Sequence, residues 1–344
     1  MIPVVGMLLT GPTGEDFGTL KPPPVEMLEE RFGRLPGWRR REPGYEPPWR
    51  RGWVAALVAA LLAIAVVGLP LALGMAVCTS DHPWKDLEGV TALSAGDENA
   101  CVVQADGSVA CWSWSNRHQG LTDPVEGEFL TLSVSEEHGC AVRLDGSVAC
   151  WGSNVYGKST PPTGRFTSVS TGESHTCGVT TEGVVVCWGS NAYGKSTPPT
   201  GRFTSVSAGT HTCAIREDGS VACWGPQTEA VRPPHPPRPF LAISTGDAFT
   251  CGIRDDRSVV CWGANGSGQA TPPAGRFISI DAGQKHACGV RTDYTVACWG
   301  ENAKGEAKPP LGVFTSVSAA GDKTCGITTN GTVVCWGDVT TRWP

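Results

Sequence analysis

The stretch Cys213-Ala-Ile-Arg-Glu-Asp-Gly-Ser-Val-Ala-Cys223, followed at once by Trp224-Gly225, decides the fold. Two short apolar runs flank a Glu-Asp-Gly turn, and Gly219 can supply the positive φ that a three-residue hairpin loop with a bulge requires. If Arg216 and Ser220 form the hydrogen-bonded pair beside the loop, Cys213 lies opposite Cys223 in a non-hydrogen-bonded pair. The two Cα atoms are closest in such a pair, so the stretch predicts a β-hairpin closed by a cross-strand disulfide.

The same ten-residue cysteine spacing occurs seven times, which accounts for fourteen of the fifteen cysteines and leaves only Cys78. A zinc site needs closer ligand spacing of the C-x-x-C kind, so the spacing favours disulfides, and we expect neither a metal nor another cofactor. Disulfides indicate an oxidising compartment. The predicted pairs are Cys101/Cys111, Cys140/Cys150, Cys177/Cys187, Cys213/Cys223, Cys251/Cys261, Cys288/Cys298 and Cys325/Cys335.

The first cysteines of successive pairs are separated by 39, 37, 36, 38, 37 and 37 residues, a period typical of solenoids and propellers. Each repeat adds an apolar run such as Phe203–Ser207, and a fourth, short edge strand is expected near its Thr-Pro-Pro segment. Both faces of the hairpin are apolar, and neighbouring copies in a ring would cover them. Residues 89–344 are therefore predicted to form an all-β, seven-bladed β-propeller, in which blade 7 either completes itself or takes a strand from near Val90.

The repeat pattern Trp-Gly-x-Asn-x-x-Gly, preceded by an Ala-Gly-x-x-His segment and an Asp-Gly hairpin, resembles the repeat of the regulator of chromosome condensation family. The resemblance covers about residues 88–344 and implies a seven-bladed propeller; secreted bacterial members of this kind include a propeller-type β-lactamase inhibitory protein. Two copies depart from the pattern, because Arg257 and Tyr294 replace the turn glycine. Retaining a positive φ there would cost up to about 1 kcal/mol at each position.

Ahead of the repeats, residues 1–52 form a Pro/Arg-rich stretch whose composition predicts a disordered tail. Val54 to Val77 contains no charged residue, and twenty-four residues of helix would be about 36 Å long, enough for a hydrocarbon core of about 30 Å. We expect a transmembrane signal anchor at 53–77 and a linker at 78–88. Arginines precede the span and acidic residues follow it, so the tail is predicted to be cytoplasmic and the propeller extracytoplasmic in a single-pass protein of the cell membrane.

Two other interpretations of the anchor remain open. Gly74-Met75-Ala76 offers small residues for signal peptidase, and Met75-Ala76-Val77-Cys78 loosely resembles a lipobox that would place a lipid on Cys78. Either alternative still places the repeats outside the cytoplasm.

Several sets of side chains are candidate sites. His138, His175, His211 and His286 each precede a first cysteine by two residues, and we expect packing rather than metal binding, because Asn99, Phe249 and Lys323 fill the place elsewhere. The tryptophan after each pair is expected between blades. Two adjacent repeats each have a loop with a tyrosine, Tyr156 and Tyr193. Because tyrosine is a common interface anchor, these two loops predict a binding surface. Its residues are Asn154, Tyr156, Lys158, Asn191, Tyr193 and Lys195.

The net charge of −6 and an acidic repeat region argue against a nucleic-acid partner. The sequence contains no motif of a serine hydrolase, zinc protease, P-loop or dinucleotide-binding enzyme. We therefore expect a non-enzymatic, membrane-tethered propeller that binds an unidentified protein at the cell surface. The alternative is a protein that binds or hydrolyses a cell-wall glycan, which would need convergent carboxylates at one end of the propeller.

Overall fold

The computed structural model describes residues 84, 87, 89–115, 122–123, 125–226, 228, 230, 232–234 and 239–339. Within these residues the regular elements are twenty-one strands and two short 3-10 helices, so the fold is all-β. None of the helices in this part of the chain is long and apolar enough to span a bilayer. The predicted tail 1–52 and the predicted anchor 53–77 lie outside the described residues.

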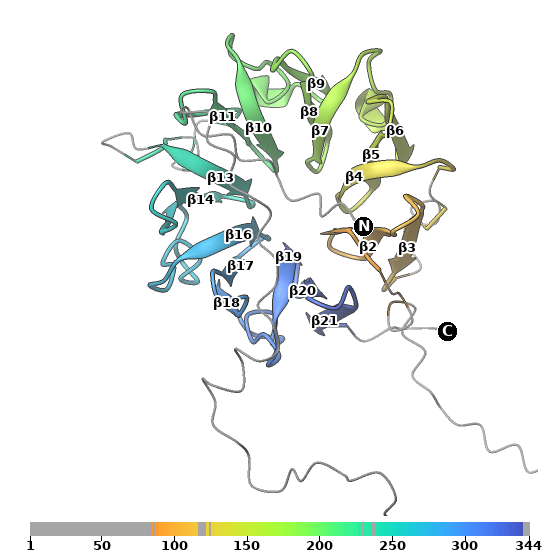
Figure 1. The fold of residues 1–344 in the computed structure, drawn as a ribbon. Coiled ribbons are helices and arrows are strands. Elements are labelled where there is room, and N and C mark those ends of the chain that lie inside the picture. Colours follow the sequence, from red (N-terminus) through yellow and green to blue (C-terminus); the bar gives the residue numbers. More distant parts are fainter. Residues whose placement is uncertain are drawn as a thin grey trace, which may run out of the picture. The chain divides into compact units, whose positions relative to one another are not determined.

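The strands form seven antiparallel sheets of three strands each, and every sheet keeps the chain order of its strands. We number these sheets as blades 1 to 7 and call their strands inner, middle and outer (Figure 1). Blades 1 to 4 contain β1 (Ala92–Ala95), β2 (Asn99–Val103), β3 (Val109–Ser113), β4 (Phe129–Val134), β5 (His138–Arg143), β6 (Val148–Gly152), β7 (Phe166–Thr171), β8 (His175–Thr180), β9 (Val185–Gly189), β10 (Phe203–Ala208), β11 (Thr212–Arg216) and β12 (Val221–Trp224). Blades 5 to 7 contain β13 (Phe240–Thr245), β14 (Phe249–Arg254), β15 (Val259–Gly263), β16 (Phe277–Ala282), β17 (His286–Arg291), β18 (Val296–Gly300), β19 (Phe314–Ala320), β20 (Lys323–Thr328) and β21 (Val333–Gly337).

The predicted hairpin forms in the expected register. The Arg216 amide donates to the Ser220 carbonyl at 2.8 Å, Gly219 has a φ of 79°, and Cys213 pairs directly with Cys223. The same direct pairing of two cysteines joins the middle and outer strands of every blade. The turn and the ladder therefore place the cysteines as the spacing predicts.

All seven cysteine pairs stand at disulfide distance, each within a single blade. The S–S separations are 2.03 Å for Cys101–Cys111, 2.12 Å for Cys140–Cys150, 2.06 Å for Cys177–Cys187, 2.05 Å for Cys213–Cys223, 2.00 Å for Cys251–Cys261, 2.06 Å for Cys288–Cys298 and 2.08 Å for Cys325–Cys335. The Cα–Cα separations are 4.0 to 4.1 Å.

The two cysteines of a pair differ in burial. The first cysteine lies on the middle strand and is fully buried in every blade, whereas the second lies on the outer strand and is only partly buried. The sequence did not indicate this difference. The partly buried cysteines are Cys111, Cys150, Cys187, Cys223, Cys261, Cys298 and Cys335.

The two hairpins without a turn glycine keep the same backbone conformation. Arg257 has a φ of 69° and Tyr294 a φ of 67°, the left-handed region that side chains with a Cβ atom disfavour. Both residues thus retain the positive φ that glycine has in the other hairpins. The surrounding ladder therefore fixes the turn even where the residue does not favour it.

The inner strands contact one another in order around a ring, and the last contacts the first (Figure 1). In six blades a serine near the end of the inner strand accepts a hydrogen bond from a backbone amide of the next blade. In blade 6 the acceptor is the side chain of Asp281. The ring closes because Ser318 of blade 7 accepts from the amide of Ala95 in blade 1. The seven acceptors are Ser94, Ser133, Ser170, Ser207, Ser244, Asp281 and Ser318, at 2.8 to 3.0 Å.

Blade 7 completes itself and takes no strand from the region of Val90. Instead, the amide of Val90 donates to the carbonyl of Gly331 at 3.1 Å. Trp84 and Leu87, in the stretch expected as linker, pack into the apolar cluster shared by blades 7 and 1. Trp84 lies 5.6 Å from the Trp112 ring and 5.7 Å from the Trp114 ring, so aromatic packing seals this junction.

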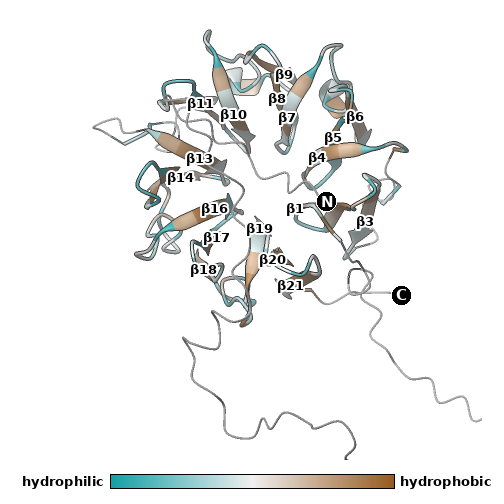
Figure 2. Ribbon diagram, in the orientation of Figure 1, coloured by the Kyte–Doolittle hydropathy of each residue, from teal (hydrophilic) through white to brown (hydrophobic). Residues whose placement is uncertain are grey.

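The core lies between neighbouring blades. Apolar residues concentrate in the strands and polar ones in the connecting loops (Figure 2). Trp188 and Trp224 are partly buried, and the other five repeat tryptophans are buried, which confirms that they are packing residues. The buried five are Trp112, Trp151, Trp262, Trp299 and Trp336.

The expected fourth strand is absent from the described residues, so that prediction was wrong. In blade 2 the Thr160 amide donates to the Gly157 carbonyl at 3.0 Å, and the Ser159 amide donates to Asn154 Oδ1 at 2.9 Å. Pro161 and Pro162 follow and have no amide to donate. The segment therefore uses its donors inside its own loop and adds no strand.

Candidate functional site

The two ends of the ring carry different loops. The inner-to-middle loops and the loops that follow the outer strands share one end, which we call the loop face. A backbone hydrogen bond joins the two kinds of loop within a blade. The Ser153 amide donates to the Glu137 carbonyl at 2.8 Å and the Ser190 amide to the Ser174 carbonyl at 2.9 Å, and equivalent bonds recur in other blades. The disulfide hairpins turn at the opposite end, the hairpin face.

Tyr156 and Tyr193 are the most prominent side chains of the loop face. They lie in the 3-10 helices η1 (Val155–Gly157) and η2 (Ala192–Gly194) of blades 2 and 3, and they are 72% and 80% exposed. Both have a positive φ, of 65° and 60°. A bulky residue in this region costs about 1 kcal/mol, so two strained tyrosines project into solvent from adjacent blades.

The other residues of the predicted surface mainly hold these loops. Asn154 and Asn191 are exposed, but their amides bond Thr160 and Thr197 at 3.0 Å across the loop. The side chain of Lys158 is only 2% exposed and forms an ion pair with Glu137. Lys195 is partly buried and donates to Ser174 Oγ at 2.5 Å. Of the six predicted residues, the structure therefore leaves the two tyrosines as available contact groups.

A sequence difference between blades accounts for the strained tyrosines. At the equivalent loop position, blades 5 and 6 have Ser267 and Lys304, neither of which has a positive φ. There the side chains of Gln269 and Glu306 fold back to accept the amides of Ser267 and Lys304 at 2.8 and 2.7 Å. Blades 2 and 3 have lysine in place of Gln269 and Glu306, and an ammonium cannot accept that bond.

Carboxylates gather on the loop face as well. Burial raises the pKa of Asp97 from 3.8 to about 6, and Glu136 and Asp247 raise it further. Burial also raises the pKa of Asp247 from 3.8 to about 6, with a contribution from Glu173. These four acids come from the inner-to-middle loops of blades 1, 2, 3 and 5, and their mutual repulsion indicates that they converge.

Two lysines of the loop face make contacts within the protein. Lys323 donates to the backbone carbonyl of Asp97 at 2.6 Å, and Lys285 lies 3.7 Å from a carboxylate oxygen of Glu301. In the described part of the chain, no group of three His, Cys, Asp or Glu side chains is placed to hold a metal ion.

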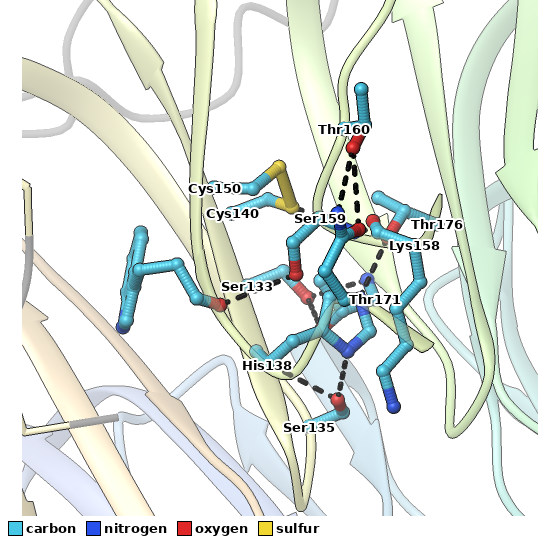
Figure 3. Close-up of a disulfide and its surroundings, with 12 residues drawn as sticks. Ser133, Ser135, His138, Cys140, Cys150, Lys158, Ser159, Thr160, Thr171 and Thr176 are labelled. Atoms are coloured by element: carbon cyan, nitrogen blue, oxygen red, sulfur yellow. Dashed lines mark hydrogen bonds between the residues drawn. A yellow bond between two sulfur atoms is a disulfide. The ribbon is translucent and has the colours of Figure 1, made fainter. Parts of the chain in front are cut away.

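The repeated histidines join neighbouring blades. His138 lies between Ser135 and Thr176 (Figure 3), and its Nε2 is 2.7 Å from Thr176 Oγ1. The Thr176 hydroxyl donates to the Lys158 carbonyl, so Nε2 must supply the proton of the histidine bond. Burial lowers the pKa of His138 from 6.5 to about 3, which keeps the ring neutral. The same contact joins His175 to Thr212, His211 to Thr250, and His286 to Thr324 at 2.7 to 2.8 Å.

Two signals in the sequence could have revealed these features. A threonine directly before the first cysteine occurs wherever the preceding repeat has the histidine; otherwise the residue is Ala100, Gly139 or Ala287. Acids also recur in the inner-to-middle loop, at Asp97, Glu136, Glu173 and Asp247. Judged one repeat at a time, each residue is unremarkable, and the pattern emerges only when positions are compared between successive repeats.

Comparison with known proteins agrees with this architecture. Residues 131–158, 166–195, 240–269 and 277–306 match the regulator of chromosome condensation (RCC1) repeat. These segments are RCC1 repeats. They belong to blades 2, 3, 5 and 6 and include both tyrosine loops. Among curated proteins, none matches the sequence.

Solved structures of three other proteins are similar in fold. The CRINKLY WD40 ectodomain of the Arabidopsis thaliana receptor kinase ACR4 is 28% identical, with a TM-score of 0.61, over 74% of this chain and 97% of that one. The ectodomain of the Physcomitrella patens receptor kinase CR4 is 23% identical, with a TM-score of 0.62, over 74% of each chain. Prp20p of Saccharomyces cerevisiae is 13% identical, with a TM-score of 0.57, over 72% of this chain and 82% of that one.

Proposed function

We propose that this protein is a recognition module: a membrane-tethered RCC1-type propeller that binds another protein outside the cytoplasm through its loop face. The observation that carries the proposal is the pair of exposed, strained tyrosines on adjacent blades. Tyrosine provides a large, rigid contact surface at low cost in conformational entropy, and it is enriched among residues that dominate binding energy.

The extracytoplasmic location has two supports. Seven cysteine pairs at disulfide distance are typical of proteins in oxidising compartments. The Arabidopsis propeller, at 28% identity, is itself a receptor ectodomain. The uncharged stretch 53–77, preceded by arginines, would be the tether and would hold the tail 1–52 in the cytoplasm.

Capture of surface proteins on the immobilised full-length chain tests the function. We expect a partner that is retained by the natural chain and lost with the double variant Tyr156→Ser/Tyr193→Ser. The matched control is Leu144→Ser/Val184→Ser, which removes exposed apolar side chains of the same two blades from the hairpin face. If no partner is retained, or if the control variant loses it equally, binding by the loop face is refuted.

Protease treatment of intact cells tests the location. Added protease should remove an epitope tag fused after Pro344 and spare one fused before Met1. The opposite pattern would exclude an extracytoplasmic propeller.

The carboxylates favour one second candidate, a glycan hydrolase. Asp97 and Asp247 have pKa values of about 6, and a raised pKa is what a general acid requires. Release of reducing ends from wall polysaccharide, abolished by Asp97→Asn, would replace the recognition function with this one. Unchanged polysaccharide would exclude it.

A further inference from the structure

The tyrosine loops are tied to their surroundings in a way that prepares them for a ligand. Lys158, two residues after Tyr156, bonds Glu137 of its own blade and the Glu173 carbonyl of the next blade at 3.2 Å. Lys195, two residues after Tyr193, bonds Ser174 of its own blade. The loops are thus anchored from below while the rings remain in solvent, so binding would require little ordering of this surface.

The carboxylates of the loop face favour one kind of occupant. Asp97, Glu136, Glu173 and Asp247 share the loop face with the tyrosines; burial raises the pKa of Asp97 and of Asp247, and repulsion from other acids of this set raises both further. In contrast, Arg143 and Arg216 lie at the hairpin face, where each guanidinium stacks 4.9 Å above a phenylalanine ring, on Phe129 and Phe203. An approaching cation would relieve the repulsion among the carboxylates, whereas an approaching anion would increase it.

We infer that the partner of this surface is a basic polypeptide segment, whose arginine or lysine side chains lie over the rings of Tyr156 and Tyr193 and pair with the carboxylates of the same face. This inference rests on the proposed function and specifies its partner. Aromatic faces attract cations within about 6 Å of the ring centre, and arginine can combine that contact with a bidentate carboxylate bond. A glycan could also stack on tyrosine and donate its hydroxyls to the carboxylates, but an uncharged glycan would not neutralise their charge.

The tyrosine hydroxyls play no part in this contact, which provides a sharp control. Tyr156→Phe/Tyr193→Phe keeps the ring faces, so affinity should stay within about twofold of the natural chain. Tyr156→Ser/Tyr193→Ser removes them, so affinity should fall by about tenfold or more. Asp97→Asn/Asp247→Asn should weaken binding as well and reduce its dependence on salt concentration.

Binding of fluorescein-labelled peptides to the full-length chain, followed by fluorescence anisotropy, tests the inference. Three peptides of equal length share one Gly/Ser background and carry arginines, glutamates or no charge, and a labelled chitin oligosaccharide provides the glycan arm. We expect the arginine peptide alone to bind. Its affinity should fall with the serine variant, and persist with the phenylalanine variant and with the Leu144→Ser/Val184→Ser control.

The failures are distinguishable. If the arginine peptide fails to bind, or binds no better than the glutamate or uncharged peptide, the basic partner is refuted. Tyrosine-dependent binding of the oligosaccharide alone would assign the surface to a glycan. A protein captured through the tyrosines that then binds through an acidic or uncharged segment would leave the proposed function standing and overturn only this inference. A capture experiment that retains no protein would refute the proposed function itself.

Discussion

The contact between His175 and Thr212 predicts a measurable coupling between blades 3 and 4. His175 Nε2 lies 2.7 Å from Thr212 Oγ1, both residues are fully buried, and the Thr212 hydroxyl donates to the Lys195 carbonyl at 3.2 Å. Thr212→Ala leaves the histidine N–H unsatisfied and removes the bond to the carbonyl. An unpaired buried donor costs about 1 to 3 kcal/mol, so we expect a loss of about 2 to 3 kcal/mol of unfolding free energy.

The protein contains its own template for repairing this damage. At the next-but-one junction, Phe249 takes the place of the histidine and Ala287 that of the threonine, and both are buried in one apolar cluster. His175→Phe alone should cost about 1 kcal/mol, because Thr212 keeps its bond to the carbonyl. The double variant His175→Phe/Thr212→Ala leaves no buried polar group of the pair without a partner. Its loss of unfolding free energy should therefore be about 2 kcal/mol smaller than the sum of the two single losses.

Unfolding followed by tryptophan fluorescence, with the disulfides intact, measures the four chains of this cycle. The control combines His175→Phe with Thr250→Ala, two residues that belong to different junctions, and these effects should add. If the contacting pair is also additive within about 0.5 kcal/mol, the histidine and threonine are not coupled and our account of the junction is refuted.

Four further outcomes are expected. Arg257→Gly and Tyr294→Gly should each stabilise the chain by up to about 1 kcal/mol, because glycine relieves the positive φ; unchanged melting temperatures would contradict this. Cys213→Ser/Cys223→Ser should lower the unfolding free energy by about 2 kcal/mol, measured against the natural chain under non-reducing conditions, whereas no loss would show that the pair does not constrain the chain. The buried histidines have pKa values lowered to about 3 or 4, so the unfolded chain binds more protons than the folded chain, and the unfolding free energy should fall as pH drops from 6.5 towards 4. The variant His175→Phe/Thr212→Ala should make this dependence of stability on pH less steep. An unchanged pH dependence would exclude His175 as a contributor. Asp97 and Asp247 have the opposite effect on the pH dependence of stability, because their raised pKa values make the folded chain bind more protons than the unfolded chain between pH 3.8 and 6. The variant Asp97→Asn/Asp247→Asn should therefore stabilise the chain above pH 6 but not at pH 4. Equal stabilisation at the two pH values would contradict the raised pKa values.

The local hairpin could be predicted from sequence because its determinants are adjacent in the chain. The Asp-Gly turn, the ten-residue spacing and the alternation of the ladder together place Cys213 opposite Cys223. The number of blades followed from counting copies. The absence of a fourth strand was not foreseen. The amides of Ser159 and Thr160 donate within their own loop, to Asn154 Oδ1 and to the Gly157 carbonyl, and these contacts depend on how the loop folds.

Contacts between blades were harder to predict from single repeats. His138 looks like a packing residue until Thr176, thirty-eight residues later, is placed against it. Lysine is usually exposed, so Lys158 was expected in an exposed surface. In the structure its ammonium group pairs with Glu137, and the Lys158 carbonyl accepts a hydrogen bond from Thr176 of the next blade. The backbone strain of Tyr156 depends on whether residue 158 can accept a hydrogen bond from the loop, and a single repeat does not reveal this dependence.

Disulfide mapping is the most direct test that the ring is built from seven self-contained ribbons in an oxidising compartment. The chain would be isolated from its native cells with free thiols blocked, digested without reduction, and its linked peptides identified by mass spectrometry. We predict seven links, each joining cysteines ten residues apart, such as Cys140 to Cys150. Bridges between different blades, or unpaired thiols at these positions, would contradict it.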